Sequence, residues 1–235
     1  MKIIKINGVI GYWEADPKEI VYEIEQTNED ITIEIDSVGG SVMGGFSIAN
    51  AIEAHKAKGY KVNIEGGAIV ASIASYIAMN GSQFTIKENT TFMIHNAWLP
   101  VSGDFNVLRK AADLSEGLSS IIAKAYTKKS KIKDKEVKEM MNAETFLFGN
   151  EITKKGFAND LKETNSGANK SEAMALAMET LKACNNSIVV NESVSFEAVA
   201  KLLPNDFKQE VEEVENKIDT DSKLKREISL KLMER

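Results

Sequence analysis

The sequence has few of the residues that characterise several common protein classes. It contains a single cysteine, Cys184, so no internal disulfide can form, and we expect that side chain to be an inert, small apolar group on a helix. Lys and Arg total 29 against 35 Asp and Glu, and the net charge of −6 offers no electrostatic footprint for nucleic acid or an anionic membrane. The longest apolar stretch, about Ile69–Met79, is far shorter than the roughly 20 residues of a membrane span. With no signal peptide evident at its start, we expect a cytoplasmic protein.

Glycine is also unevenly distributed. All 15 glycines fall at or before Gly167, beside the polar, turn-rich stretch Lys162–Glu172. We therefore expect a domain over residues 1–161, a linker over 162–172 and a helical C-terminal extension of unknown role over 173–235. The extension carries charges of both signs and no sustained heptad pattern that would establish a coiled coil.

Before that boundary, strand-like and helix-like segments alternate. Period-two patterning predicts strands, and apolar spacing of three and four residues predicts helices. The expected strands are Lys2–Gly8, Ile31–Ser37, Tyr60–Gly67 and two within Gln83–Trp98, and the expected helices are Asp16–Asn28, a segment ending at Gly59, Ala71–Gly81, Gly103–Ser130 and Asp134–Asn142. This succession indicates an α/β core with a largely parallel sheet.

Two serines lie in the apolar stretch EGGAIVASIASYIAMNG, at Ser72 and Ser75. A strand, a glycine turn and a helix would place Ser72 near a helix N-terminus, where unpaired N–H groups favour developing negative charge. A serine hydroxyl becomes a strong nucleophile only when a neighbouring base takes its proton. The alternative is that these serines are small packing residues.

Only two histidines are available as a base. His95 follows an apolar strand in TFMIHNAW, and strand ends of α/β sheets are where ligands usually bind. Paired with a serine, its imidazole would be a general base, although a lone histidine can equally be structural. His55 lies late on a helix among charged neighbours, and we expect its side chain to be solvated and to interact favourably with the C-terminal end of the helix dipole.

The stretch IDSVGGSV places Gly39 and Gly40 between a strand and a helix. Glycines there let backbone N–H groups point into a site, as in the oxyanion hole of acyl-transfer enzymes, although the pair could also form an ordinary turn. The pattern is not GxxxxGK[ST] and no lysine follows, which argues against a phosphate-binding P-loop. The residues alone leave the acid of a Ser-His-acid triad undecided, since triads are recognised by geometry rather than by sequence order.

Four blocks in this order resemble the Clp protease proteolytic subunit family, and in particular its phage-encoded head maturation relatives. The blocks are DSVGGSV, GGAIVAS, MIHNAW and AETFLFGNEITKKGFAND, and the resemblance covers about residues 1–160. It implies that Ser72 is the nucleophile, nine positions before Gly81 as in the family block, and that His95 is the base. It also implies oxyanion donors at the N–H groups of Gly39 and Ile73.

The resemblance places the triad acid at Glu144, where housekeeping members have aspartate. It implies no metal and no cofactor. The implied fold is a ββα superhelix of the crotonase type, in which a handle helix (about Gly103–Lys129) joins two stacked rings of subunits. The implied substrates are proteins or peptides, including capsid or scaffold proteins in the host cytoplasm if the chain is phage-encoded. No Walker motif is present and no axial-loop segment is evident before the first strand, which leaves docking to an unfoldase ATPase open.

Three other interpretations remain at this stage. The first is a catalytically inactive, ring-forming scaffold protein of the same fold. The second is a Ser-Lys peptidase of the signal-peptide-peptidase type, which would need a buried lysine. The third is an acyl-CoA enzyme of the crotonase fold, which would use backbone oxyanion donors without a Ser72–His95 pair.

Overall fold

The computed structural model describes residues 1–11 and 15–162, and the fold below is that of these residues. The linker and extension expected beyond residue 161, and Cys184, lie outside them apart from Lys162. The strands are β1 (Lys2–Ile10), β2 (Ile31–Gly40), β3 (Val62–Ala71), β4 (Gln83–Lys87), β5 (Thr91–Ile94), β6 (Thr145–Phe148) and β7 (Asp160–Lys162). The helices are α1 (Pro17–Gln26), α2 (Val42–Ala57), α3 (Ile73–Met79), α4 (Phe105–Ser130), α5 (Asp134–Asn142) and α6 (Asn150–Lys154).

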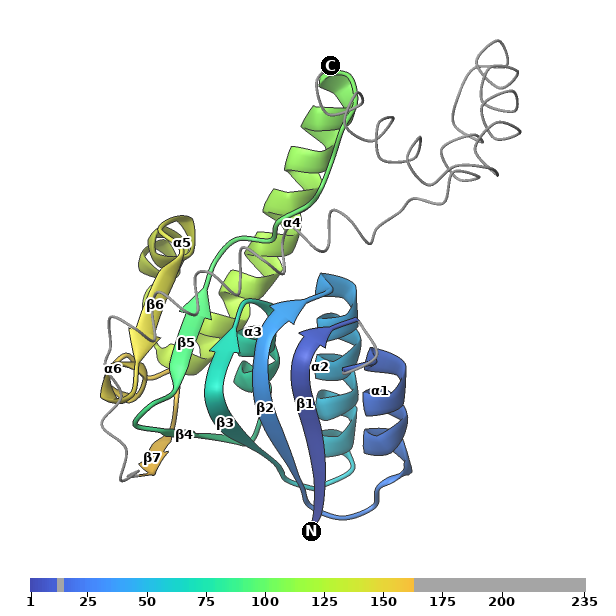
Figure 1. Ribbon diagram of the computed structural model, residues 1–235, viewed down its shortest axis with the longest axis vertical. Helices are drawn as coiled ribbons and strands as arrows, with labels where there is room; N and C mark the ends of the chain where they lie inside the picture. Colours follow the sequence, from blue (N-terminus) through green and yellow to red (C-terminus); the bar gives the residue numbers. More distant parts are fainter. Residues whose placement is uncertain (12–14, 163–235) are drawn as a thin grey trace, which may run out of the picture. The chain divides into compact units, whose positions relative to one another are not determined.

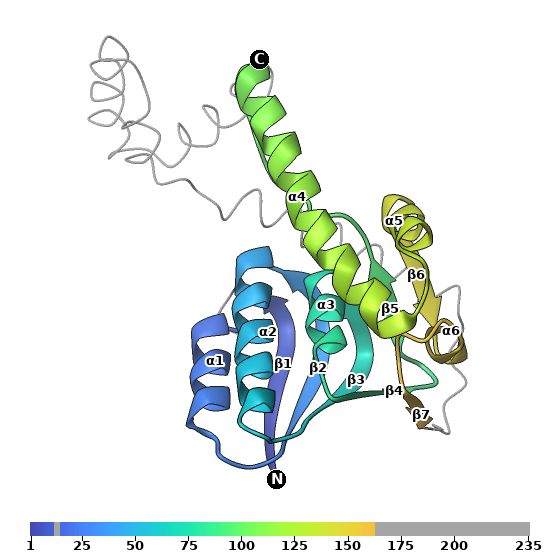
Figure 2. The same ribbon diagram turned by 180° about the vertical axis from the view of Figure 1, so that it is seen from behind.

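Strand and helix alternate from β1 to β4, and the strands form a parallel sheet in the order β1-β2-β3-β4-β7. Helices α1, α2 and α3 lie together on one face of this sheet (Figures 1 and 2). The start of α1 follows from local sequence: Asp16 caps the helix by accepting a hydrogen bond from the Lys18 N–H, and Pro17 occupies the first turn. The predicted α/β class with a largely parallel sheet is confirmed.

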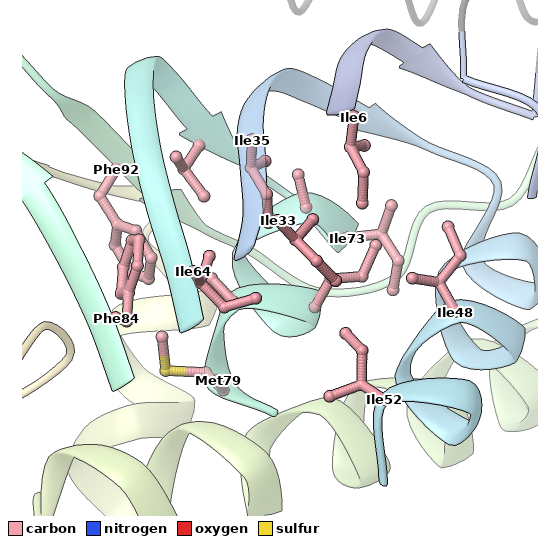
Figure 3. Close-up of a cluster of buried hydrophobic side chains, with 14 of the residues drawn as sticks. Ile6, Ile33, Ile35, Ile48, Ile52, Ile64, Ile73, Met79, Phe84 and Phe92 are labelled. Carbon is pink, nitrogen blue, oxygen red and sulfur yellow. The ribbon is translucent and has the colours of Figure 1, made fainter. Parts of the chain in front are cut away.

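The core lies between the sheet and these helices. Alternate strand residues Ile33, Ile35 and Ile64 point toward Ile48 and Ile52 of α2, and all are essentially buried (Figure 3). Period-two strands and a helix with apolar residues four apart each present one apolar face. Joining those faces removes both from water, which is the main favourable contribution to folding.

The central strand β3 changes partner along its length. Asn63–Glu65 pair with β4, whereas Ile69–Ala71 pair with β5. Between them the register with β2 shifts, and Gly67 packs so closely on Asp36 that an added Cβ would lie 2.7 Å from its Cγ. The predicted glycine turn before Ser72 is therefore wrong, because the double glycine forms an irregularity inside β3 and the strand continues to Ala71.

The long helix α4 is capped by Asp104 and confirms the predicted helix over this region. Its C-terminal half packs on the body of the protein through Leu118 and Ile122, while its N-terminal half extends past the sheet (Figures 1 and 2). Apolar side chains on α4 remain exposed at Phe105, Val107, Leu108, Leu114 and Ile121. The predicted apolar face is thus divided between an internal contact and an uncovered surface.

One expected side-chain environment is wrong. His55 is buried, with 1% of its surface exposed, and its Nε2 lies 2.8 Å from the Glu29 carbonyl oxygen. The charged residues beside it in the sequence are on other faces of α2, while His55 lies on the face that packs inward. The pattern also did not identify β6, α6 and β7, because strands of three or four residues and one helical turn are too short to show periodicity.

Candidate active site

Ser72 occupies the junction between β3 and α3. It is the N-cap residue of α3, yet its side chain makes no capping hydrogen bond, and its backbone has φ 56° and ψ −128°. This conformation is costly for a non-glycine residue and is found mainly at functional sites. The side chain instead turns toward His95, whose Nε2 lies 2.7 Å from Ser72 Oγ.

The pairing of β3 with β5 brings these two residues together. Ala71 lies opposite Met93, and the Ser72 N–H donates to the Met93 carbonyl oxygen at 3.0 Å. His95 follows the last residue of β5, so both side chains emerge at the same edge of the sheet. Burial lowers the pKa of His95, and the negative charge of Glu144 offsets part of that effect by raising it. A neutral imidazole at the Ser72 hydroxyl is the protonation state that a general base requires.

Ser75 occupies a different environment from Ser72. It is fully buried, and its Oγ lies 2.6 Å from the Ser72 carbonyl oxygen, 2.8 Å from the Met93 carbonyl oxygen and 2.8 Å from the Tyr126 hydroxyl. Burial strongly raises the pKa of Tyr126, so this phenol stays protonated. Ser75 and Tyr126 therefore connect α3, β5 and α4 beneath the candidate nucleophile. The role of Tyr126 was not found from the sequence, where it is one more apolar-face residue of α4.

Gly39 approaches Ser72 from β2. Its φ is +103°, and an added Cβ would lie 2.6 Å from Ser72 Cβ. Its N–H donates to Ser37 Oγ at 3.1 Å, and the Ser37 hydroxyl in turn donates to the Gly8 carbonyl oxygen at 2.6 Å. The N–H of Gly39 is therefore beside the candidate nucleophile and already hydrogen-bonded to the buried Ser37. Nothing in the sequence except its closeness to the glycine pair pointed to Ser37.

Ile73 is the first residue of α3, and its side chain is buried in the core (Figure 3). N–H groups in the first turn of a helix lack partners within that helix. The N–H of Ile73 follows Ser72 directly, so the start of α3 offers a donor next to the candidate nucleophile.

Glu144 immediately precedes β6, which pairs antiparallel with β5. Ile94 lies opposite Thr145, so the next residue of one strand, His95, comes beside the preceding residue of the other, Glu144. Glu144 is exposed and has φ 47°. Within residues 1–11 and 15–162 no hydrogen bond joins Glu144 to His95, and the carboxylate acts on the imidazole through its charge alone.

The same described residues contain neither a metal-binding cluster nor a membrane-spanning helix. No three His, Cys, Asp or Glu side chains in this part of the chain are grouped so as to hold a metal ion. No helix among these residues combines the length and apolar character needed to cross a bilayer.

The comparisons with known proteins concern the family to which the chain belongs. No curated protein matches the chain. The family model described as Clp protease matches residues 18–165, which is more than half of the 235 residues and includes every candidate site residue above. The chain belongs to the Clp protease family, a family of serine-type peptidases that act on protein substrates and form oligomeric rings.

Proposed function

We propose that this protein is a serine endopeptidase in which Ser72 is the nucleophile, His95 the general base and Glu144 the acid of the triad. The observation that carries the proposal is the 2.7 Å contact between Ser72 Oγ and His95 Nε2. Membership of the Clp protease family supports it. So does the strained backbone at Ser72 and Glu144, two of the three non-glycine residues with positive φ in the described part of the chain.

The proposed reaction follows from these positions. His95 Nε2 accepts the Ser72 proton as Oγ attacks the peptide carbonyl, and the resulting imidazolium then protonates the leaving amine. Water, activated by the same imidazole, releases the acyl group and restores the serine. Glu144 stabilises the imidazolium electrostatically from the neighbouring strand end.

The oxyanion is held by the N–H groups of Ile73 and Gly39. Ile73 has the geometry of a first-turn donor, whereas the Gly39 N–H must exchange its Ser37 partner for the oxyanion. A preorganised donor of this kind contributes about 3–4 kcal/mol to transition-state stabilisation. The exchange partly offsets that contribution, because one hydrogen bond is given up for another.

The proposal extends to assembly and setting. The exposed apolar residues of α4 would be covered by a second copy of this chain in a ring, as expected for a handle helix. We propose that the substrates are capsid or scaffold proteins of a phage and that cleavage takes place in the cytoplasm of the host cell. The domain boundary at residue 161 and a tethering role for the extension belong to the same proposal.

The decisive experiment labels the assembled protein with a fluorophosphonate probe. We expect wild type and Ser75→Ala to be labelled at Ser72, and Ser72→Ala to lose labelling while keeping its oligomer size. Because the two serines are three residues apart, Ser75→Ala is a closely matched control. Labelling that persists in Ser72→Ala would overturn the assignment.

A catalytically inactive scaffold is the second candidate. Two observations favour it: the Gly39 N–H is already bonded to Ser37, and Glu144 lacks a hydrogen bond to His95 within the described residues. Correctly assembled wild type that fails to react with the probe would establish it. A Ser-Lys mechanism has less support, since no lysine in the described ranges hydrogen-bonds to Ser72. Full activity in His95→Ala would restore it.

A further inference from the structure

A pocket of about 480 Å³, with both polar and apolar groups in its lining, lies between α4, α5 and the segment that follows β5. It is open to solvent on one side. Its lining includes Asn96, Ser115, Glu116, Ser120, Lys138 and Asn142. None of these residues has a role in the proposed triad or oxyanion hole.

The pocket is anchored to both strand ends of the proposed triad. Asn96 follows His95 directly, and its Nδ2 donates to Asn142 Oδ1 at 2.8 Å. Asn142 in turn lies two residues before Glu144. A side chain in this pocket would therefore belong to the part of a substrate close to the reacting carbonyl.

Helix α4 holds the pocket wall in place. The Ala97 N–H donates to Ser119 Oγ at 2.9 Å, and Ser115 Oγ donates to the Ala97 carbonyl oxygen at 2.6 Å. Both backbone groups of Ala97 are thus bound by hydroxyls one helical turn apart. The segment from His95 to Ala97 is fixed against α4, so the pocket is preformed.

The groups left available in the pocket select one kind of side chain. The Lys138 ammonium group is paired with Asp134 at 2.9 Å. Within residues 1–11 and 15–162, neither the Glu116 carboxylate nor the Ser120 hydroxyl has a hydrogen bond or ion pair. An unpaired carboxylate beside a hydroxyl complements a cation that carries several N–H donors.

A basic side chain can use groups in this pocket that an apolar side chain cannot. Its N–H donors can bond to the Glu116 carboxylate and the Ser120 hydroxyl, and its methylene stem can contact the apolar part of the lining. Because Glu116 is exposed, water competes for the carboxylate and the resulting preference is modest.

We propose that this pocket binds a lysine or arginine side chain of the substrate near the scissile bond, and that Glu116 determines this specificity. The inference rests on the proposed peptidase function and adds to it the substrate class. Because the carboxylate is exposed, the selectivity is that of a solvent-screened ion pair and decreases as salt is added.

The test uses fluorogenic peptides of one sequence in which a single position, from the third residue before the scissile bond to the second after it, is Lys, Arg, Gln, Leu or Glu. With the assembled full chain, we expect kcat/KM for Lys and Arg to exceed that for Gln about fivefold at one position. Glu116→Gln should abolish this ratio, and Glu116→Lys should shift the preference toward Glu. Asp113→Asn removes another exposed carboxylate of α4 that does not line the pocket and should keep the ratio.

A second measurement does not depend on hydrolysis. Binding of the Lys and Gln peptides to Ser72→Ala, followed by fluorescence anisotropy, should show the same ratio, and adding Glu116→Gln should remove it. Equal binding and cleavage at every position, or a ratio that survives Glu116→Gln, would overturn the inference. Failure of the peptidase proposal is seen separately, as wild type that neither labels with fluorophosphonate nor cleaves any peptide.

Discussion

The hydrogen bonds beneath Ser72 allow one prediction to be worked out in detail, for Ser75→Ala. In the folded protein Ser75 has one proton, donated to the carbonyl oxygen of Ser72 or Met93, and its oxygen accepts the proton of Tyr126. Both carbonyl oxygens have other donors, because the Ser72 N–H bonds to Met93 and the Tyr76 N–H bonds to Ser72. The group that loses its partner is therefore the Tyr126 hydroxyl.

The magnitude follows from the burial of that hydroxyl. Tyr126 is fully buried, and its remaining contact, to the Ser72 carbonyl oxygen, is long at 3.4 Å. A buried donor without a partner costs about 1–3 kcal/mol, so Ser75→Ala should lower the free energy of unfolding by that amount. Tyr126→Phe removes the donor itself and should cost about 1 kcal/mol. The double variant should cost about 1 kcal/mol less than the sum of the two, since no unpaired hydroxyl remains.

The assay is denaturant unfolding of the full chain at one fixed protomer concentration, followed by circular dichroism, because assembly makes stability concentration-dependent. Each variant is also incubated with the fluorophosphonate probe. Strict additivity in the cycle would refute the proposed hydrogen bond between Ser75 and Tyr126. Loss of labelling in a folded, assembled Ser75→Ala would refute the view that Ser75 is structural and Ser72 reactive.

Three further predictions concern the proposed machinery. Burial lowers the pKa of His95, so the acid limb of kcat/KM against pH should have its midpoint below the ordinary histidine pKa of about 6.5. Glu144→Gln removes the charge that raises this pKa and should move the midpoint lower still. A midpoint that rises in Glu144→Gln would contradict the electrostatic role of Glu144. Gly39→Ala places a Cβ 2.6 Å from Ser72 Cβ at a φ of +103° and should abolish probe labelling, with circular dichroism checking that the fold survives. Ser37→Ala leaves the Gly39 N–H without its acceptor and should lower the unfolding free energy by about 1–2 kcal/mol in denaturant titrations; unchanged stability would show that this bond contributes nothing.

Local sequence was sufficient wherever a segment's own residues decide its conformation. Asp16 and Pro17 marked the start of α1, and the apolar spacing marked α4, because capping and amphipathic periodicity involve neighbours within a few residues. The predictions that proved wrong concern residues whose environment depends on segments far away in the chain. The sequence predicts a glycine turn at Gly67, yet this residue lies inside β3. Its backbone packs closely on Asp36 of the adjacent strand, which the local sequence does not specify. His55 was expected in water, yet the face on which it lies is covered.

The candidate site shows the same division. The sequence predicts Ser72 near the N-terminus of a helix, beyond a strand and a glycine turn, and His95 at the end of an apolar strand. It does not predict that β3 changes its pairing partner from β4 to β5, which brings Ser72 Oγ within 2.7 Å of His95 Nε2, or that the pairing of β6 with β5 places Glu144 beside His95. The physical reason is that a periodic pattern specifies which face of an element is apolar but not which distant element covers it. Strand pairing between residues far apart in the chain is decided by the packing of the whole core.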